Sequence, residues 1–422
     1  MKKISYFLSL ALVLCAVHFV PAQMKSDPSG TWGGALATDA GPGGLEITLA
    51  RDGAQWKGTM KFRLEGQEAV PTVRELKING AEFSCTFDVD RNLVKLHGAF
   101  AGDKLSGTVE AFRDDRKLGG GTFSLTFGGQ MPPLQQAQGG QRADPDFNTK
   151  VESPAYKKNG PKVLFDEAHN NFHTASGRYK PFADLITNDG YQVVPNKQVF
   201  SRETLKGHRV LVISNAIGAA RMNDANASNS AFTEEESDAV RDWVKSGGSL
   251  LLIADHAPMG SANQSLGKRF GVDMSKMYTA DEQNFDKESQ NSGFIVYTRD
   301  SGRLADHPVT RGRNASERVN KIVTFTGQSL KGPADSIAFL KLADTAMDLM
   351  PGQNSKPVSA AGRAQGVAMK FGKGRVIVMG EAGMLSAQIT GPQRTPFGMN
   401  RPGIDNRQLA LNIMHWLSGV LK

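Results

Sequence analysis

The sequence predicts a chain of two domains, an all-β antiparallel domain followed by an α/β domain with a mostly parallel sheet. Two observations predict this division. Short segments of alternating apolar and polar residues fill positions 28–128, with turn signals such as DG, NG and GD between them. From Pro161 onward, apolar strand-like segments alternate with helix-like segments, which is typical of βαβ units. The length of 422 residues is sufficient for two or three domains.

The first 22 residues have the composition of a Sec-type signal peptide. Lys2 and Lys3 precede an apolar run, and Val20-Pro21-Ala22 supplies a cleavage site of small residues. We therefore expect cleavage after Ala22 and a periplasmic or secreted bacterial protein, with an uncleaved anchor as the alternative. No later segment is apolar over the length of a membrane span, so no stable membrane insertion is expected after cleavage.

Residues 28–128 are expected to form a barrel or sandwich of antiparallel strands. Segments such as LEITLAR, WKGTMKFRL and AEFSCTFDV alternate with a period of two, and no stretch here has a helical period. The next residues, 129–160, are rich in Gly, Gln and Pro. That composition indicates an exposed linker between the two domains.

Residues 161–422 are expected to form the α/β domain. KVLFDEA, RVLVISNA and SLLLIADHA read as buried strands, and NRQLALNIMHWLSG reads as a helix capped by Asp405. The clearest helix starts at Thr233, which is expected to form a capping box with Glu236, and stops at Gly247. Residues 272–360 are less regular and are expected to insert additional strands.

Composition excludes several classes of function. The chain has 50 Lys+Arg against 42 Asp+Glu and no basic run, so nucleic acid is not an expected partner. Two cysteines exclude a disulfide scaffold and a Cys-rich metal site. The string DEAH at 166–169 matches a helicase box, but no G-x-x-x-x-G-K-[ST] loop accompanies it. The expected partner is instead a small molecule, a sugar or a peptide.

Ligands bind beyond the carboxyl ends of the strands in an open parallel sheet, so the polar residues at those ends are the candidate site. The strand ends carry Asp166, His169, His173, Asp255, His256 and Glu381. Carboxylates and imidazoles from three strands are thereby expected to converge on one edge of the sheet. The alternative is that these residues cap helices and hydrogen-bond to loop backbone.

His169 and His173 are four residues apart, a spacing that zinc ligands use on a helix. We expect Asp166, His169 and His173 to bind a divalent metal such as zinc, with Asp255 as the alternative carboxylate ligand and Glu381 as the base. Position 170 is Asn where the metalloprotease motif requires Glu, so that mechanism is not expected.

The remaining three residues are the expected catalytic groups of a hydrolase, namely Asp255, His256 and Glu381. Without a metal, Asp255 would orient His256 as a general base. Ser261 is the nearest candidate nucleophile in the sequence, although G-x-S-x-G does not occur in the chain.

Several segments resemble a known superfamily. VLFDEAHNNFH, DHPVTRG, GRVIVMGEAGMLS and DNRQLALNIMHWL together make residues 161–420 similar to the glutamine-amidotransferase-like superfamily, in a divergent branch without the catalytic cysteine. The resemblance implies a flavodoxin-like sheet with the functional turn after the fourth strand. That turn reads ADHAPMG here and holds no Cys, which excludes amide hydrolysis by a thiolate. Residues 28–128 are similar to small lipocalin-like β domains, through the starting motif W-x-G at Trp32 to Gly34 and the closing motif G-T-F-x-L-x at Gly121 to Thr126.

Three functional hypotheses follow. The first is an exported hydrolase that uses a metal or a His/carboxylate pair at the strand ends. The second is a non-catalytic ligand- or partner-binding module of the cell envelope. The third, which rests on fold analogy alone, is a scaffold in envelope assembly or gliding-type transport. Whether the chain is an enzyme stays open at this point.

Overall fold

The computed structural model describes residues 27–38, 41–64, 67–89, 92–113, 116–131, 141–222, 224–350, 356–391 and 393–422. The predicted signal peptide at 1–22 lies outside these residues, as does the part of the predicted linker at 132–140. The chain divides into two compact units. The first comprises Met1–Thr38, Gly43–Leu64 and Glu68–Leu134, and the second is mainly Gln135–Lys422.

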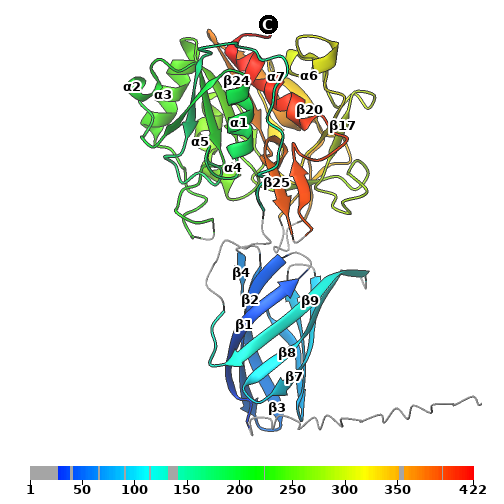
Figure 1. Ribbon diagram of the computed structural model, residues 1–422. Coiled ribbons are helices and arrows are strands. Elements are labelled where there is room, and N and C mark those ends of the chain that lie inside the picture. The colour runs from blue at the N-terminus through cyan, green and yellow to red at the C-terminus, as the bar shows by residue number, and fades with distance from the viewer. Residues whose placement is uncertain are drawn as a thin grey trace, which may run out of the picture. The chain divides into compact units, whose positions relative to one another are not determined.

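The first unit is a nine-stranded sheet with the strand order β4-β3-β2-β1-β9-β8-β7-β6-β5 (Figure 1). Its strands are β1 (Gly30–Thr38), β2 (Gly41–Asp52), β3 (Gln55–Leu64), β4 (Gln67–Ala69), β5 (Val73–Asn79), β6 (Glu82–Val89), β7 (Asn92–Ala101), β8 (Lys104–Arg113) and β9 (Arg116–Phe127). Neighbours such as β7 and β8 pair antiparallel, and β3 also lies next to β5, so the sheet nearly closes into a barrel. Apolar side chains that alternate along the strands fill its interior, including Trp32, Leu105 and the thiol of Cys85.

The second unit is built on another nine-stranded sheet, in which β12-β11-β13-β14-β24-β23-β19-β15 follow one another and β20 pairs with β23. Its strands are β11 (Lys162–Asp166), β12 (Gln192–Asn196), β13 (Val210–Ser214), β14 (Ser249–Ile253), β15 (Asp273–Met274), β19 (Leu330–Lys331), β20 (Ile337–Lys341), β23 (Ala364–Phe371) and β24 (Gly374–Met379). Three small sheets accompany it. The first consists of β10 (Arg142–Ala143), β25 (Ala387–Thr390) and β26 (Thr395–Gly398), and the second of β16 (Tyr278–Ala280), β21 (Met347–Leu349) and β22 (Val358–Ser359). The third pairs β17 (Val296–Thr298) with β18 (Lys321–Val323).

The prediction of a flavodoxin-like, mostly parallel sheet is wrong. The run from β12 to β24 is parallel, but β23, β19, β15 and β20 join the sheet through antiparallel pairings. The reason is visible at the β23–β24 connection, where Phe371 pairs with Gly374 and only two residues lie between. A connection that short can only join antiparallel strands, whereas a parallel crossover needs a dozen residues or more. The described chain as a whole is β-rich, with many short antiparallel strands and few helices.

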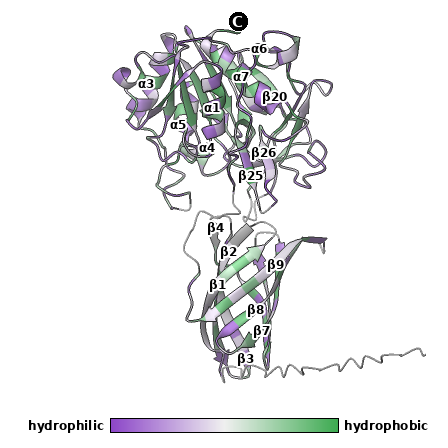
Figure 2. Ribbon diagram, viewed as in Figure 1, coloured by the Kyte–Doolittle hydropathy of each residue, from purple (hydrophilic) through white to green (hydrophobic). Residues whose placement is uncertain are grey.

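Helices cover both faces of the second sheet. The helical segments are α1 (Lys180–Asn188), α2 (Arg202–Leu205), α3 (Glu234–Lys245), α4 (Met259–Ala262), α5 (Gln264–Arg269), α6 (Pro308–Arg311) and α7 (Asn406–Ser418), with two 3₁₀ turns, η1 (Ala315–Glu317) and η2 (Gly383–Leu385). α1 and α7 share one apolar core with the strands, and α2, α3 and α5 share the other. Figure 2 shows α3 as largely hydrophilic, whereas α7 is buried along most of its length.

Two helix starts can be compared with the sequence. Thr233 and Glu236 form the predicted capping box at α3. Asp405 occupies the N-cap position of α7, but its carboxylate instead accepts hydrogen bonds from the backbone N–H groups of Asn320 and Lys321. Within the described ranges, no helix combines the length and the apolar character that crossing a membrane requires.

Candidate functional site

The parallel strands of the second unit place polar groups along one edge of the sheet. β11 ends at Asp166 and β13 at Ser214, while Asp255 and Glu381 follow β14 and β24. Because these four strands are neighbours in parallel register, their ends lie along the same edge. The predicted site residues therefore share an edge, but their side chains have very different surroundings.

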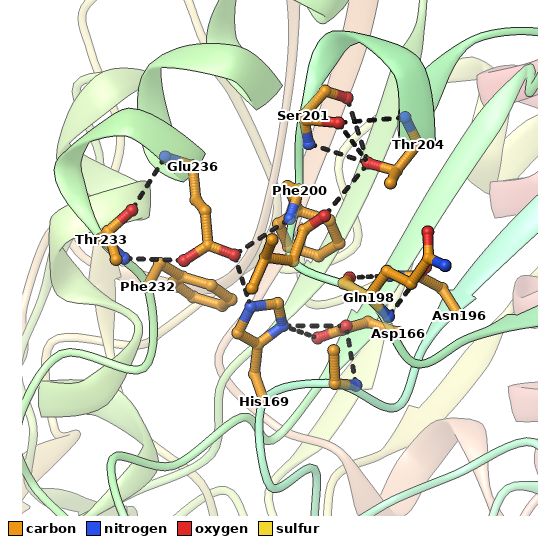
Figure 3. Close-up of polar contacts among 12 residues, drawn as sticks. Asp166, His169, Asn196, Gln198, Phe200, Ser201, Thr204, Phe232, Thr233 and Glu236 are labelled. Carbon is orange, nitrogen blue, oxygen red and sulfur yellow. Dashed lines mark hydrogen bonds and ion pairs between the residues drawn. The ribbon is translucent and has the colours of Figure 1, made fainter.

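His169 is held between two carboxylates (Figure 3). Its Nδ1 lies 2.9 Å from both carboxylate oxygens of Asp166, and its Nε2 lies 2.9 Å from Oε1 of Glu236. Burial alone lowers the pKa of His169, but hydrogen bonds and charges from Asp166 and Glu236 outweigh that effect, so the pKa is raised. An imidazolium, which donates from both nitrogens, satisfies this geometry.

The same contacts join the loop after β11 to the start of α3. The carboxylate of Glu236 accepts hydrogen bonds from the backbone N–H of Thr233, at 3.0 Å, and from the backbone N–H of Phe200, at 2.9 Å (Figure 3). The His169 ring packs against Phe200 and Phe232, with ring centroids 4.6 and 4.8 Å away. Both ring nitrogens are engaged, so neither offers a lone pair to a metal ion.

His173 is buried in a separate place. Its Nδ1 lies 3.2 Å from Oγ of Ser214, and its ring stacks on Tyr179 with centroids 4.6 Å apart. Burial, followed by the charge of Arg178, lowers the pKa of His173 to about 3, so the imidazole is neutral. The side chain therefore packs in the core as an uncharged ring with one hydrogen bond.

The expected zinc pair does not assemble on a helix face. Residues 167–173 form a loop, and Asn170 has a positive φ of 48°. In the part of the chain that the structure describes, no group of three or more His, Cys, Asp or Glu residues is placed to hold a metal ion. Zinc binding by Asp166, His169 and His173 stays a prediction that this geometry does not favour.

Glu381 is fully buried, and its carboxyl group accepts hydrogen bonds from the backbone. Its Oε2 accepts the N–H of Met384 at 2.8 Å, and its Oε1 accepts the N–H of Gly383, so the carboxyl group caps η2. Burial, followed by the charge of Asp255, raises the pKa of Glu381 well above its ordinary value. The two carboxyl groups thus influence each other, but Glu381 is inaccessible to a substrate.

Asp255 and His256, two of the predicted catalytic residues, have partly exposed side chains, with exposed fractions of 13% and 17%. Nδ1 of His256 lies 2.9 Å from the carbonyl oxygen of Ala257, which requires that Nδ1 carry the proton. Nε2 of the neutral ring is then an acceptor, 3.7 Å from Oδ1 of Asp255. The imidazole stacks on Tyr278 with ring centroids 3.8 Å apart.

Buried amides fix the backbone of this pair. Oδ1 of Asn215, a residue with a positive φ of 49°, accepts the N–H of Asp255 at 2.9 Å. Nε2 of Gln328 donates to the carbonyl oxygen of Asp255 at 2.9 Å. The sequence analysis missed Gln328 and Tyr278, whose chain segments carry no motif.

Neither the candidate nucleophile Ser261 nor a surface hollow extends the site formed by Asp255 and His256. Ser261 lies in α4, and no hydrogen bond joins it to His256 in the described structure. A surface hollow of about 480 Å³ is lined by residues 147–151 and Asn188, none of them a predicted site residue. The chemistry available at the strand ends is therefore that of Asp255 and His256.

No protein-family model and no curated protein sequence match this chain. Among solved structures, the chain is similar to the N-terminal domain of mmIFT52, with 14% identity, a TM-score of 0.44, and coverage of 61% of this chain and 97% of that one. It is also similar to two cytoplasmic proteins from Salmonella typhimurium. STM3548 has 12% identity, a TM-score of 0.36 and coverage of 61% and 98%, and STM1381 has 14% identity, a TM-score of 0.35 and coverage of 61% and 99%. We draw no functional conclusion from likenesses this distant.

The predicted resemblance to the glutamine-amidotransferase-like superfamily, with a lipocalin-like domain before it, is wrong. The described chain is β-rich, and its second sheet is mixed rather than flavodoxin-like. The short motifs that suggested the resemblance are strand ends and helix starts, which many folds containing parallel strands share.

Proposed function

We propose that the second unit is a ligand-binding module in which Asp255 and His256 contact a small polar molecule, such as a sugar or a peptide. The observation behind this proposal is the pair itself. Oδ2 of Asp255 and Nε2 of His256 have no hydrogen-bond partner among the described residues, and both side chains are partly exposed. Two adjacent acceptors suit a ligand that presents two neighbouring donors.

The rigidity of the pair supports binding more than turnover. Backbone hydrogen bonds from Asn215 and Gln328 hold Asp255, and the stack on Tyr278 holds His256. A site fixed before the ligand arrives loses little conformational entropy on binding. Hydrolysis would additionally require an activated nucleophile.

The proposal is tested by thermal shift with a panel of monosaccharides and dipeptides. We expect one class of compound to raise the Tm of the wild-type protein, because a ligand that binds only the folded state stabilises it. Asp255→Asn and His256→Ala should each abolish that shift. Asp335→Asn and His97→Ala change exposed residues elsewhere and should retain it. A shift that persists in both site variants would show that the ligand binds elsewhere, and a panel without any active member would argue against the proposal.

Hydrolysis by the same pair is a second candidate, favoured by one observation. The hydrogen bond from Nδ1 of His256 to Ala257 leaves Nε2 as a base, beside the carboxylate of Asp255. If this candidate holds, chromogenic esters or glycosides should be turned over by the wild-type protein and not by His256→Ala. Binding that survives in a protein without turnover would leave the ligand-binding module as the function.

Export completes the proposal. Its support is the signal-like composition of residues 1–22, which lie outside the described residues. N-terminal sequencing of the protein recovered from the periplasm or medium should begin at Gln23. Recovery of the intact N-terminus from the cytoplasm would contradict export.

A further inference from the structure

Gln328 is a fully buried side chain that bridges two chain segments. Its Nε2 donates to the carbonyl oxygens of Ala254 at 2.8 Å and Asp255 at 2.9 Å. Its Oε1 accepts the backbone N–H of Lys276 at 2.8 Å, two residues before Tyr278. The two segments joined by this amide carry the two rings that stack on each other, His256 and Tyr278.

The backbone of Gln328 attaches a third segment. Its N–H donates to the carbonyl oxygen of Gly380 at 2.7 Å, next to Glu381. One residue thus connects the end of β14, the 275–278 segment and the end of β24. All of its polar side-chain groups are used, which is the condition for burying an amide without a large cost.

The surrounding chain leaves room for this amide. A Cβ atom at Gly260 would lie 2.6 Å from Oε1 of Gln328, and one at Gly380 would lie 2.3 Å from its carbonyl oxygen. Lys276 and Thr326 adopt positive φ values of 63° and 78°, which cost energy for residues with a Cβ. Conformations of this kind persist only where surrounding contacts enforce them.

We infer that Gln328 is the positioning residue that assembles the Asp255–His256–Tyr278 face from separate chain segments. That this face binds a ligand rests on the proposed function, but the claim that Gln328 holds His256 against Tyr278 can be tested on its own. A buried glutamine that only stabilised the fold would lower stability without altering the stacking of His256 on Tyr278. Gln388, also buried in the second unit but located in β25, supplies the comparison.

The experiment compares Gln328→Met with Gln388→Met in the full chain. Methionine keeps the length of glutamine and removes its hydrogen bonds. NMR of the histidine side chains should show His256 with the upfield shift of a ring stacked on an aromatic face. We expect Gln328→Met to lose that upfield shift, and Gln388→Met to keep it.

A second variant covers the case in which Gln328→Met does not fold. Gly260→Ala keeps the amide but places a methyl group 2.6 Å from Oε1, so the amide of Gln328 must shift, while the helical backbone at Gly260 accepts alanine without a strained φ. It should weaken the same His256 signature. An unchanged His256 resonance in a folded Gln328→Met or Gly260→Ala protein would overturn the inference.

The outcomes separate this inference from the proposed function. If the His256 signature is lost in Gln328→Met but Asp255→Asn retains every ligand-induced Tm shift, Gln328 positions a face that is not the binding site. If the signature survives while Asp255→Asn abolishes the Tm shift, the binding site stands and the positioning role of Gln328 is wrong.

Discussion

At the scale of single residues, the pKa values of the two histidines in the first strand-end loop are shifted in opposite directions. His169 lies between Asp166 and Glu236 and its pKa is raised, whereas the pKa of His173, buried beside Tyr179, is lowered to about 3. Two residues of one type, four positions apart, therefore make folding stability depend on pH with opposite slopes. Neither could be assigned from the sequence, because the partners of each ring come from distant segments.

The raised pKa of His169 predicts a loss of stability at alkaline pH. An unfolded histidine has a pKa of about 6.5, so the folded state retains the proton to higher pH than the unfolded state does. The stabilisation is fully present below about pH 6.5 and is lost as pH rises through the folded pKa. His169→Gln should cost about 3–5 kcal/mol below about pH 6.5, where the ring is protonated, because it leaves buried carboxylates without their cation.

Urea unfolding across a pH series measures this effect. The wild-type protein and the exposed-site control His97→Gln should both lose stability between neutral and alkaline pH, and His169→Gln should lose less. Equal pH slopes in all three proteins would mean that His169 does not carry the proton proposed here.

His173 predicts the opposite slope on the acid side. Its folded pKa of about 3 lies below the unfolded value, so the unfolded state binds the proton first as pH falls. His173→Asn, which can still hydrogen-bond Ser214, should flatten the decline in stability between about pH 6.5 and pH 3. The same urea series measures the free energy of unfolding over this range. If that decline is the same in His173→Asn as in the wild-type protein, the buried ring of His173 is not neutral.

At the scale of elements, the first turn of α3 combines a helix cap with a charged contact. Thr233→Ala removes one side of the capping box and should cost about 1 kcal/mol. It should leave the titration of His169 unchanged, since Oε1 of Glu236 still faces the ring. Glu236→Gln keeps a hydrogen-bond acceptor at the cap but removes the charge, and should lower the pKa of His169 as observed by NMR. A pKa that drops equally in both variants would assign the effect to the helix start and not to the carboxylate.

The same element shows how far sequence patterns reach. The capping box of Thr233 and Glu236 is a local signal, and the structure contains it. That Glu236 also contacts His169, 67 positions earlier, has no local signal at all. The expectation of a mostly parallel sheet fails at β23, which a two-residue connection at Gly372 and Lys373 joins to β24 as an antiparallel neighbour, because a strand pattern by itself does not specify the direction of pairing.

At the scale of the whole molecule, each unit has an apolar core of its own. One core contains only residues of the first unit, such as Trp32 and Leu105, and the other two contain only residues of the second. The period-two pattern of residues 28–128 is what a half-buried antiparallel sheet produces, which makes this region readable from sequence. The mixed sheet and the contacts of the strand-end residues depend on pairings between distant segments, so the sequence pattern could not determine them.

Separate cores predict separate folding. Residues 141–422 expressed alone should unfold cooperatively, with the same midpoint as the corresponding transition of the full chain. Differential scanning calorimetry of the two proteins makes the comparison. A fragment that binds a hydrophobic dye and shows no transition would mean that the second unit depends on the first.

The burial of Cys85 inside the first unit has a practical consequence. Burial raises the pKa of this thiol to about 12, and the side chain is 2% exposed. Alkylating reagents and disulfide exchange both act on the thiolate, whose fraction at pH 7 is then on the order of 10⁻⁵. Cys85 should consequently react only when the sheet around it opens. The rate at which iodoacetamide alkylates Cys85, followed by mass spectrometry of its peptide, therefore measures how often the first unit opens, without a contribution from the second unit.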